Sequence, residues 1–307
     1  MISINHKAKQ FLLVIIKLLI VSGALYYIYK QLQGDKSVNW NVISSYLSVQ
    51  SILVLVIFSA TNWVLEIFKW QNLVSSFKEI TFLESAKQSL GSLTASIFTP
   101  NRIGEYGAKV LYFPKEKSKQ IILLNFIGNS TQMLVTTFFG IIGILIIHLT
   151  FQISFWHILA ISTISCVFIF LFKNIEIYGF SIKKLAQKIT SFSFIFHGRN
   201  LLFSMLRYLV FSCQFFFLLL LFNVEINLII AFGTIFSMYL LASIIPSIHL
   251  MDVAIKGSIS CYLFGQIGIE SWKIIAITTL MWVFNLVLPV LVGSYFVLRF
   301  KIQKSCL

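Results

Sequence analysis

The chain has 307 residues, 58% of them hydrophobic and 11% charged, and its mean hydropathy is +0.90. This composition excludes an ordinary soluble domain, and several apolar runs approach the roughly 20 residues that cross a bilayer. The net charge of +14 comes from basic residues in short loops beside apolar runs. That placement is typical of proteins that face anionic headgroups rather than of proteins that bind nucleic acid. The sequence therefore predicts an all-α polytopic membrane protein without a nucleic-acid partner.

Eight apolar segments follow one another along the chain. Six are long enough to predict transmembrane helices, at 11–29, 51–68, 121–149, 155–172, 201–222 and 274–298. The other two, 88–98 and 228–245, are soon followed by Pro100 and Pro246 and then by a second helical stretch. Proline lacks an N–H group and disfavours helix at the residue before it, so both segments should break. We interpret them as re-entrant hairpins, because irregular backbone at membrane depth must be buried in protein or line a wet cavity.

The two halves of the chain, about 11–149 and about 155–298, share one order: span, span, broken hairpin, long span. An Ala-Ser-Ile triplet precedes both prolines. Basic residues concentrate on one side of the spans, which predicts that both termini face the cytoplasm and that one transmembrane domain, 1–307, lies in the cytoplasmic membrane. The hairpins would then enter from opposite sides. Such an inverted-topology repeat places transporter substrates near the midplane, between broken helices.

The first break carries groups suited to an anion. Arg102 follows Pro100 by two residues, near the start of the returning half-helix. A helix start offers unpaired N–H groups and a positive dipole end, and an arginine adds a fork that matches phosphate. Gly104 permits close approach of the backbone to a ligand. These residues predict one wall of a site for a lipid headgroup.

Each break is followed by an acid and, four residues later, a lysine: Glu105 with Lys109, and Asp252 with Lys256. This spacing places both side chains on one helix face, where they can pair. Convergence of the cations predicts binding of a phosphate-bearing headgroup, or of a zwitterionic one whose ammonium meets the acids. The predicted headgroup site comprises Pro100, Arg102, Gly104, Glu105, Lys109, Asp252 and Lys256. Alternatively, the pairs only neutralise one another and hold the hairpins against the bundle.

Other polar residues within spans have plainer interpretations. Arg207, alone in its span, is expected to pair with a backbone carbonyl or to extend toward the interface. Asn125, Asn129 and Gln132 form a stripe on one helix face, which interhelical hydrogen bonding explains. We find no nucleophile–base pair, metal-ligand cluster or dinucleotide fingerprint. We therefore expect no catalytic residue, cofactor or metal, and no enzyme activity from the chain alone.

The stretch Thr-Pro-Asn-Arg-Ile-Gly-Glu-Tyr at 99–106 resembles the P-x-R-x-G-E signature of the lysylphosphatidylglycerol synthase transmembrane-domain family, whose members are also called flippase-like. The second break, from Pro246 to Gly257, is similar to that family's second proline-plus-acid segment. In multidomain relatives this module adjoins a soluble aminoacyltransferase domain and is thought to flip the aminoacylated product. The resemblance implies lipid translocation, carried at Pro100, Arg102, Gly104 and Glu105.

Two departures leave the headgroup open. Many family members have an arginine after the Gly-Glu pair, where this chain has Lys109, and the second motif reads Ser-Ile-His-Leu-Met in place of a glycine-rich run. The synthase domain is absent, so lysyl-lipid synthesis is not expected.

Three hypotheses follow from the sequence. The first is a translocase for an anionic, aminoacylated or polyprenyl-phosphate-linked lipid. The second is a non-transporting subunit that presents lipid to a separate lipid-modifying enzyme, such as a synthase or glycosyltransferase, with the loop 173–200 as its docking face. The third is a membrane-embedded transferase with Glu105 as base.

Overall fold

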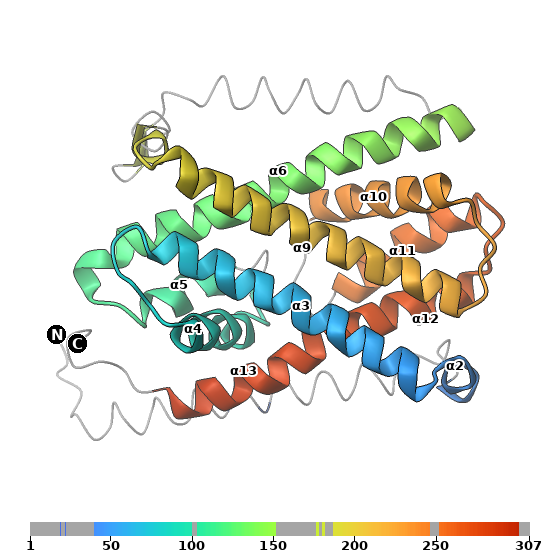
Figure 1. Cartoon of the computed structure of the whole chain (residues 1–307), viewed down its shortest axis with the longest axis horizontal. Helices are drawn as coiled ribbons and strands as arrows, with labels where there is room; N and C mark the ends of the chain where they lie inside the picture. Colours follow the sequence, from blue (N-terminus) through green and yellow to red (C-terminus); the bar gives the residue numbers. More distant parts are fainter. Residues whose placement is uncertain are drawn as a thin grey trace.

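The computed structural model describes residues 40–99, 103–151, 187–245 and 252–300, together with Leu19, Ser22 and a pair of two-residue strands. The first half contains α2 (Trp40–Tyr46), α3 (Val49–Val74), α4 (Phe82–Ala95), α5 (Ile103–Val110), the short 3-10 turn η1 (Lys115–Lys117) and α6 (Ser118–Phe151). The second contains α9 (Phe194–Leu221), α10 (Leu228–Ile244), α11 (Asp252–Gly265), α12 (Ser271–Trp282), η2 (Val283–Val287) and α13 (Leu288–Arg299). Strands β1 (Glu176–Ile177) and β2 (Phe180–Ser181) pair antiparallel. The described chain is therefore almost entirely helical (Figure 1).

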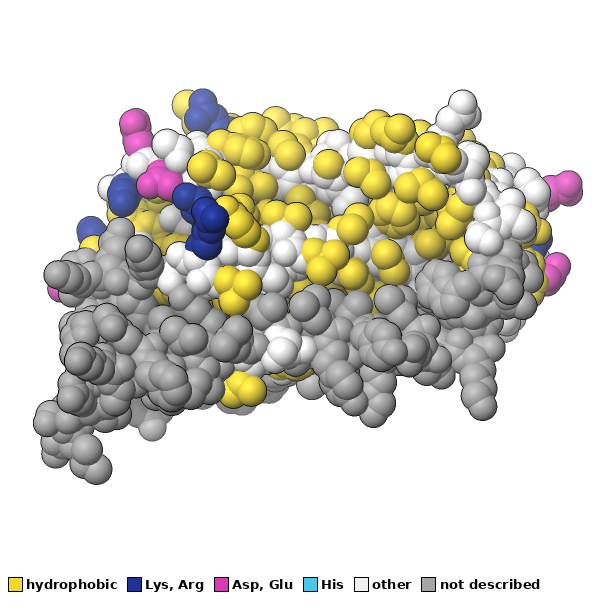
Figure 2. Space-filling view, turned by 90° about the horizontal axis from the view of Figure 1, so that it is seen from below, with side chains coloured by type: hydrophobic (Ala, Val, Ile, Leu, Met, Phe, Trp, Pro, Cys, Tyr) yellow, Lys and Arg dark blue, Asp and Glu magenta, His cyan; other side chains and the backbone are white. Residues whose placement is uncertain are grey.

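Four helical stretches in the described residues are long and apolar enough to cross a membrane: Val49–Val74, Lys115–Ile147, Phe194–Leu221 and Ser271–Arg299. They confirm the spans predicted at 51–68, 121–149, 201–222 and 274–298. On the face shown in Figure 2, hydrophobic side chains are spread over the middle of the described part, and acidic side chains lie toward its two ends. The protein is thus a multi-pass membrane protein. The predicted spans 11–29 and 155–172 lie outside the described residues, apart from Leu19 and Ser22.

Both predicted breaks separate pairs of short helices. Helices α4 and α5 flank the first break, and α10 and α11 flank the second, while the prolines themselves lie outside the described residues. Helix α4 begins earlier than the predicted 88, because the Thr81 hydroxyl accepts from the Glu84 N–H while the Glu84 carboxylate accepts from the Thr81 N–H. This reciprocal capping box fixes the helix start. Each half therefore reads long helix, two short helices, long helix.

The halves pack by exchanging their short helices. Helix α10 lies along α6, and α4 lies along α13 (Figure 1). Glycines permit both contacts: a Cβ added to Gly143 would lie 2.6 Å from the carbonyl oxygen of Gly233, and one added to Gly293 would lie 2.3 Å from that of Leu90. Small residues allow membrane helices to approach at the backbone. The first short helix of each half thus packs on the last long helix of the other.

The sequence did not predict three local features. Helix α2 lies between the predicted spans 11–29 and 51–68, where no helix was predicted. Helix α3 continues to Val74, so Lys69 lies in a membrane-spanning helix rather than in a basic loop and is only 2% exposed. The last span is interrupted by the π-helical turn η2, which changes the direction of its side chains at Asn285. Single π-turns inside α-helices are frequent at functional sites.

Candidate functional site

A cavity of about 490 Å³ lies where the two halves meet. Its wall takes residues from α3, α4, α5 and α6 of the first half, and from α9, α10, α11, α12 and η2 of the second. Aromatic and aliphatic side chains alternate there with amides and hydroxyls. Two cations, Arg207 and Lys256, line it among the described residues. Concave sites with an apolar wall and few polar groups are the usual form of small-ligand sites.

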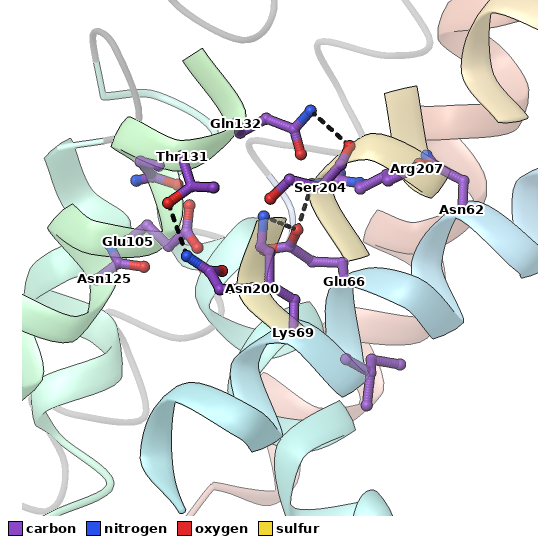
Figure 3. A network of polar contacts seen from close by, with 12 residues as sticks. Asn62, Glu66, Lys69, Glu105, Asn125, Thr131, Gln132, Asn200, Ser204 and Arg207 are labelled. Carbon is purple, nitrogen blue, oxygen red and sulfur yellow. Dashed lines mark hydrogen bonds and ion pairs between the residues drawn. The ribbon is translucent and has the colours of Figure 1, made fainter. Parts of the chain in front are cut away.

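Arg207, from the middle of α9, is held by side chains of α3. Its Nε donates to Asn62 Oδ1 at 2.9 Å, its Nη1 pairs with the Glu66 carboxylate, and its guanidinium lies 5.5 Å from the ring centre of Trp63. Glu66 also pairs with Lys69, with the Nζ and Oε2 atoms 2.7 Å apart. Figure 3 shows this cluster between α3 and α9. The sequence analysis did not predict these partners: a carboxylate and an amide within the bundle hold Arg207.

A chain of amide hydrogen bonds continues from Arg207 into η2. Asn62 Nδ2 donates to Asn285 Oδ1 at 3.2 Å, Asn285 Nδ2 to Gln214 Oε1 at 2.8 Å, and Gln214 Nε2 to the carbonyl of Leu55 at 3.3 Å. A guanidinium only donates and a carbonyl only accepts, so the two ends fix the orientation of every amide between them. This relay ties α3, α9 and the π-turn into one unit beside the cavity.

The predicted pair Glu105–Lys109 is confirmed, and it lies away from the cavity lining. The Nζ of Lys109 and the Oε1 of Glu105 are 2.7 Å apart, and both side chains are 2% exposed. Lys109 also donates to Asn125 Oδ1 at 2.8 Å and lies 3.9 Å from the ring centre of Trp70. Ion pair, hydrogen bond and aromatic face together surround the ammonium group. This arrangement favours the interpretation that the pair holds α5 against the bundle.

The local packing explains why residue 104 is a glycine. Its N–H donates to Thr99 Oγ1 at 2.9 Å, and an added Cβ would lie 2.8 Å from that oxygen and 3.1 Å from the Cα of Ser96. The return of the chain from α4 into α5 therefore requires a residue without a side chain here. Tyr106, two residues further along α5, does line the cavity.

The second break places its lysine differently. Lys256 lines the cavity, with its Nζ 5.8 Å from the ring centre of Phe211. Asp252 begins α11, one turn before Lys256, and its side chain lies outside the described part of the structure. The predicted site residues Pro100 and Arg102 also lie outside it. Of the predicted set, the described structure thus brings Lys256 to the cavity.

The polar stripe on α6 makes interhelical hydrogen bonds, as predicted. Asn125 accepts from Lys109, Asn129 donates to the Tyr106 hydroxyl at 3.2 Å, and Gln132 donates to the carbonyl of Ser204 at 3.3 Å. Asn129 and Gln132 also line the cavity. Figure 3 shows Gln132 directed from α6 toward Ser204 on α9.

The polar residues of α3 and η2 that form the cluster beside Arg207 were not predicted from the sequence. Asn62, Glu66 and Lys69 recur at helical spacing inside an apolar run, and this signal indicates a polar helix face that requires partners in the bundle. Asn285 carried no comparable signal, because it is a single amide whose role depends on the π-turn.

Among the described residues, no group of three or more His, Cys, Asp or Glu side chains is placed to hold a metal ion. Comparison with known proteins gives no match to a family model, to a curated protein or to a solved structure.

Proposed function

We propose that this protein is a lipid translocase that passes a phosphate-bearing lipid headgroup through the cavity between its two halves. The supporting observation is the position of the cavity, bordered by both pairs of short helices and lined by Arg207 and Lys256. Partly buried cations suit a phosphate, while apolar wall residues suit the proximal acyl or prenyl chain. The resemblance of 99–106 to the flippase-like family supports the same function. The candidate substrates are anionic, aminoacylated and polyprenyl-phosphate-linked lipids.

In the proposed mechanism the two halves form an inverted repeat with six spans, and their short helices are re-entrant. Alternating exposure of the cavity to the two leaflets would carry the headgroup across, as in transporters built from such repeats. Because α4 packs on α13 and α10 packs on α6, the first short helix of each half would move together with the last long helix of the other half. We place the protein in the cytoplasmic membrane with both termini inside.

A substitution that fills the cavity tests this proposal. Ser243 lines the cavity from an exposed position, so Ser243→Trp should enter the cavity without disturbing a packed core. The adjacent Ile244 is 53% exposed and does not line the cavity, which makes Ile244→Trp the matched control. Translocation would be measured in proteoliposomes with a panel of acyl-chain-labelled lipids and a membrane-impermeant quencher.

We expect wild type and Ile244→Trp to move at least one lipid class and Ser243→Trp to lose that movement. Equal rates in empty and protein-containing vesicles for every lipid would contradict a translocase. Together with stable copurification of a lipid-modifying enzyme, that outcome would favour the subunit that presents lipid to a separate enzyme.

A further inference from the structure

The last span is divided by η2 into two helices that pack on different halves of the protein. In the described part of the chain, α12 packs on α11 and α9 of the second half, whereas α13 packs on α4 of the first (Figure 1). Leu280 and Phe284 belong to a hydrophobic core made mainly of second-half residues, and Leu286 and Val290 belong to a core shared with α4. The change from one core to the other therefore falls within the π-turn.

The backbone of the last span is also weakened at this turn. Proline has no N–H group, so Pro289 cannot donate to the carbonyl of Asn285, four residues before it, as an α-helix requires. Nor can it donate to that of Phe284, five residues before it, as a π-helix requires. The preceding N–H, of Leu288, reaches the carbonyl of Val283 with π-helical spacing. Sharp bends in helices occur at prolines and at π-turns, and this span has both at one point.

Side chains of α3 supply donors to the same two carbonyls. The Ser59 hydroxyl donates to the carbonyl of Phe284, and Trp63 Nε1 donates to that of Asn285 at 3.1 Å. Between them, Asn62 donates to the side chain of Asn285. The three α3 residues follow one another at helical spacing and share one face of the helix. We call these three residues, Ser59, Asn62 and Trp63, the α3 latch.

The latch and the turn both border the cavity. Asn62, Trp63 and Asn285 line it, and so do Thr278 of α12 and Leu93 of α4. Since α12 packs with the second half and α4 packs with α13, a change in the bend at η2 would move Thr278 relative to Leu93. Such a movement would change the shape of the cavity between them.

We propose that the last span is hinged at η2, that bending there opens and closes the cavity, and that the α3 latch holds the bend in the conformation of this structure. This inference rests on the proposed translocase function and identifies its moving element. Helix α13 moves with α4, and α12 moves with α11 and α9. Because one hydrogen bond contributes little net free energy in a protein, the three bonds of the latch can hold the bend and still open during turnover.

A distance across the hinge tests the proposal without requiring transport. Spin labels would be attached at Tyr262→Cys on α11 and Leu298→Cys on α13, which are 65% and 48% exposed, in a chain whose native cysteines have been replaced. Pulsed electron paramagnetic resonance on monodisperse protein in lipid nanodiscs would give the distribution of distances between the labels.

The removal of one latch bond should change this distribution. Ser59→Ala removes the donor to Phe284, and we expect it to raise the population of a second distance about fivefold, which corresponds to one hydrogen bond. Ser294→Ala is the matched control, because this buried hydroxyl also donates to a carbonyl of the last span, that of Val290 at 2.8 Å, but from within α13. Identical distributions in wild type, Ser59→Ala and Ser294→Ala would overturn the hinge.

The restoration of the missing donor tests the link to transport. Pro289→Ala returns an N–H group to the turn, so the span should resist bending, and translocation in proteoliposomes should slow about fivefold. Pro114→Ala is the control, because Pro114 precedes η1 and does not line the cavity. Equal rates in wild type and Pro289→Ala would overturn the role of the hinge in opening the cavity.

The two experiments separate the hinge from the translocase. If Ser59→Ala changes the distances while no lipid moves in wild-type vesicles, the hinge stands and the translocase fails. If lipid moves but neither Ser59→Ala nor Pro289→Ala changes the distances or the rate, the translocase stands and the hinge fails.

Discussion

The two pairs of short helices, α4 with α5 and α10 with α11, carry the same acid-to-lysine spacing and place the lysine differently. In the first, Lys109 is 1% exposed and surrounded by Glu105, Asn125 and Trp70. In the second, Lys256 lines the cavity where the halves meet. The spacing therefore identifies residues on one helix face, but the neighbouring helix decides whether that face packs against the bundle or borders the cavity.

The reason lies in what each short helix packs on. Helix α5 has eight residues and packs against α6, where Asn125 supplies an acceptor for the lysine. Helix α11 has 14 residues and packs against α10 and α12, with Lys256 on the side that borders the cavity. The first lysine faces the Asn125 amide of α6, and the second faces the cavity. The same spacing therefore gives a packed ion pair in one case and a cavity-lining cation in the other.

The largest effect is expected when the buried ion pair between Glu105 and Lys109 is removed, and it is an effect on stability. Lys109→Met removes the ammonium group that pairs with the buried Glu105 carboxylate, and we expect a loss of about 3–5 kcal/mol in the free energy of unfolding. Thermal unfolding in detergent and the monodisperse fraction on size-exclusion chromatography would measure it. The double substitution Glu105→Leu with Lys109→Met should recover most of the loss, since neither charge then remains. If Lys109→Met unfolds like wild type, the structural role of the pair is wrong.

The next largest effect on stability is expected when a side chain is added at a glycine where two helices are in close contact. Gly293→Ala places a Cβ 2.2 Å from Thr94 Oγ1 and 2.3 Å from a backbone oxygen of α4, so we expect destabilisation of about 1–3 kcal/mol. Gly107→Ala is the matched control in α5, because its Cβ meets nothing within 4 Å, and it should be neutral or stabilising by up to about 1 kcal/mol. Comparison of their melting temperatures checks the α4–α13 contact. Equal effects would contradict close packing there.

A smaller effect is expected at the start of α4. Thr81→Ala removes the hydroxyl that caps the helix, at a cost of about 1 kcal/mol. The Thr81 N–H also lowers the pKa of the Glu84 carboxyl below its ordinary value of 4.5. The capping contribution of Glu84 is therefore present above pH 4.5 and decreases as the pH falls through the lowered pKa. Melting curves of wild type and Glu84→Gln at neutral and acidic pH should converge under acid; a constant difference would exclude this contribution.

The sequence predicted those parts of the fold that depend on local pattern. Apolar length located the four described spans, and the positions of Pro100 and Pro246 located the two breaks between short helices. The spacing of Glu105 and Lys109 predicted their ion pair. The remaining site features depend on contacts between segments far apart in the chain: the α3–α9 contact brings Glu66 to Arg207, and the π-turn brings Asn285 to Asn62. No local pattern encodes these contacts.

The most direct test of the account compares translocation by Lys256→Met and Lys256→Arg in proteoliposomes that contain equal amounts of folded protein. We expect Lys256→Met to retain the wild-type melting temperature within about 2 °C but to move phosphatidylglycerol about tenfold more slowly, while Lys256→Arg keeps most of the rate because it preserves the charge. Unchanged phosphatidylglycerol movement in a well-folded Lys256→Met protein would contradict the claim that this cavity carries the headgroup.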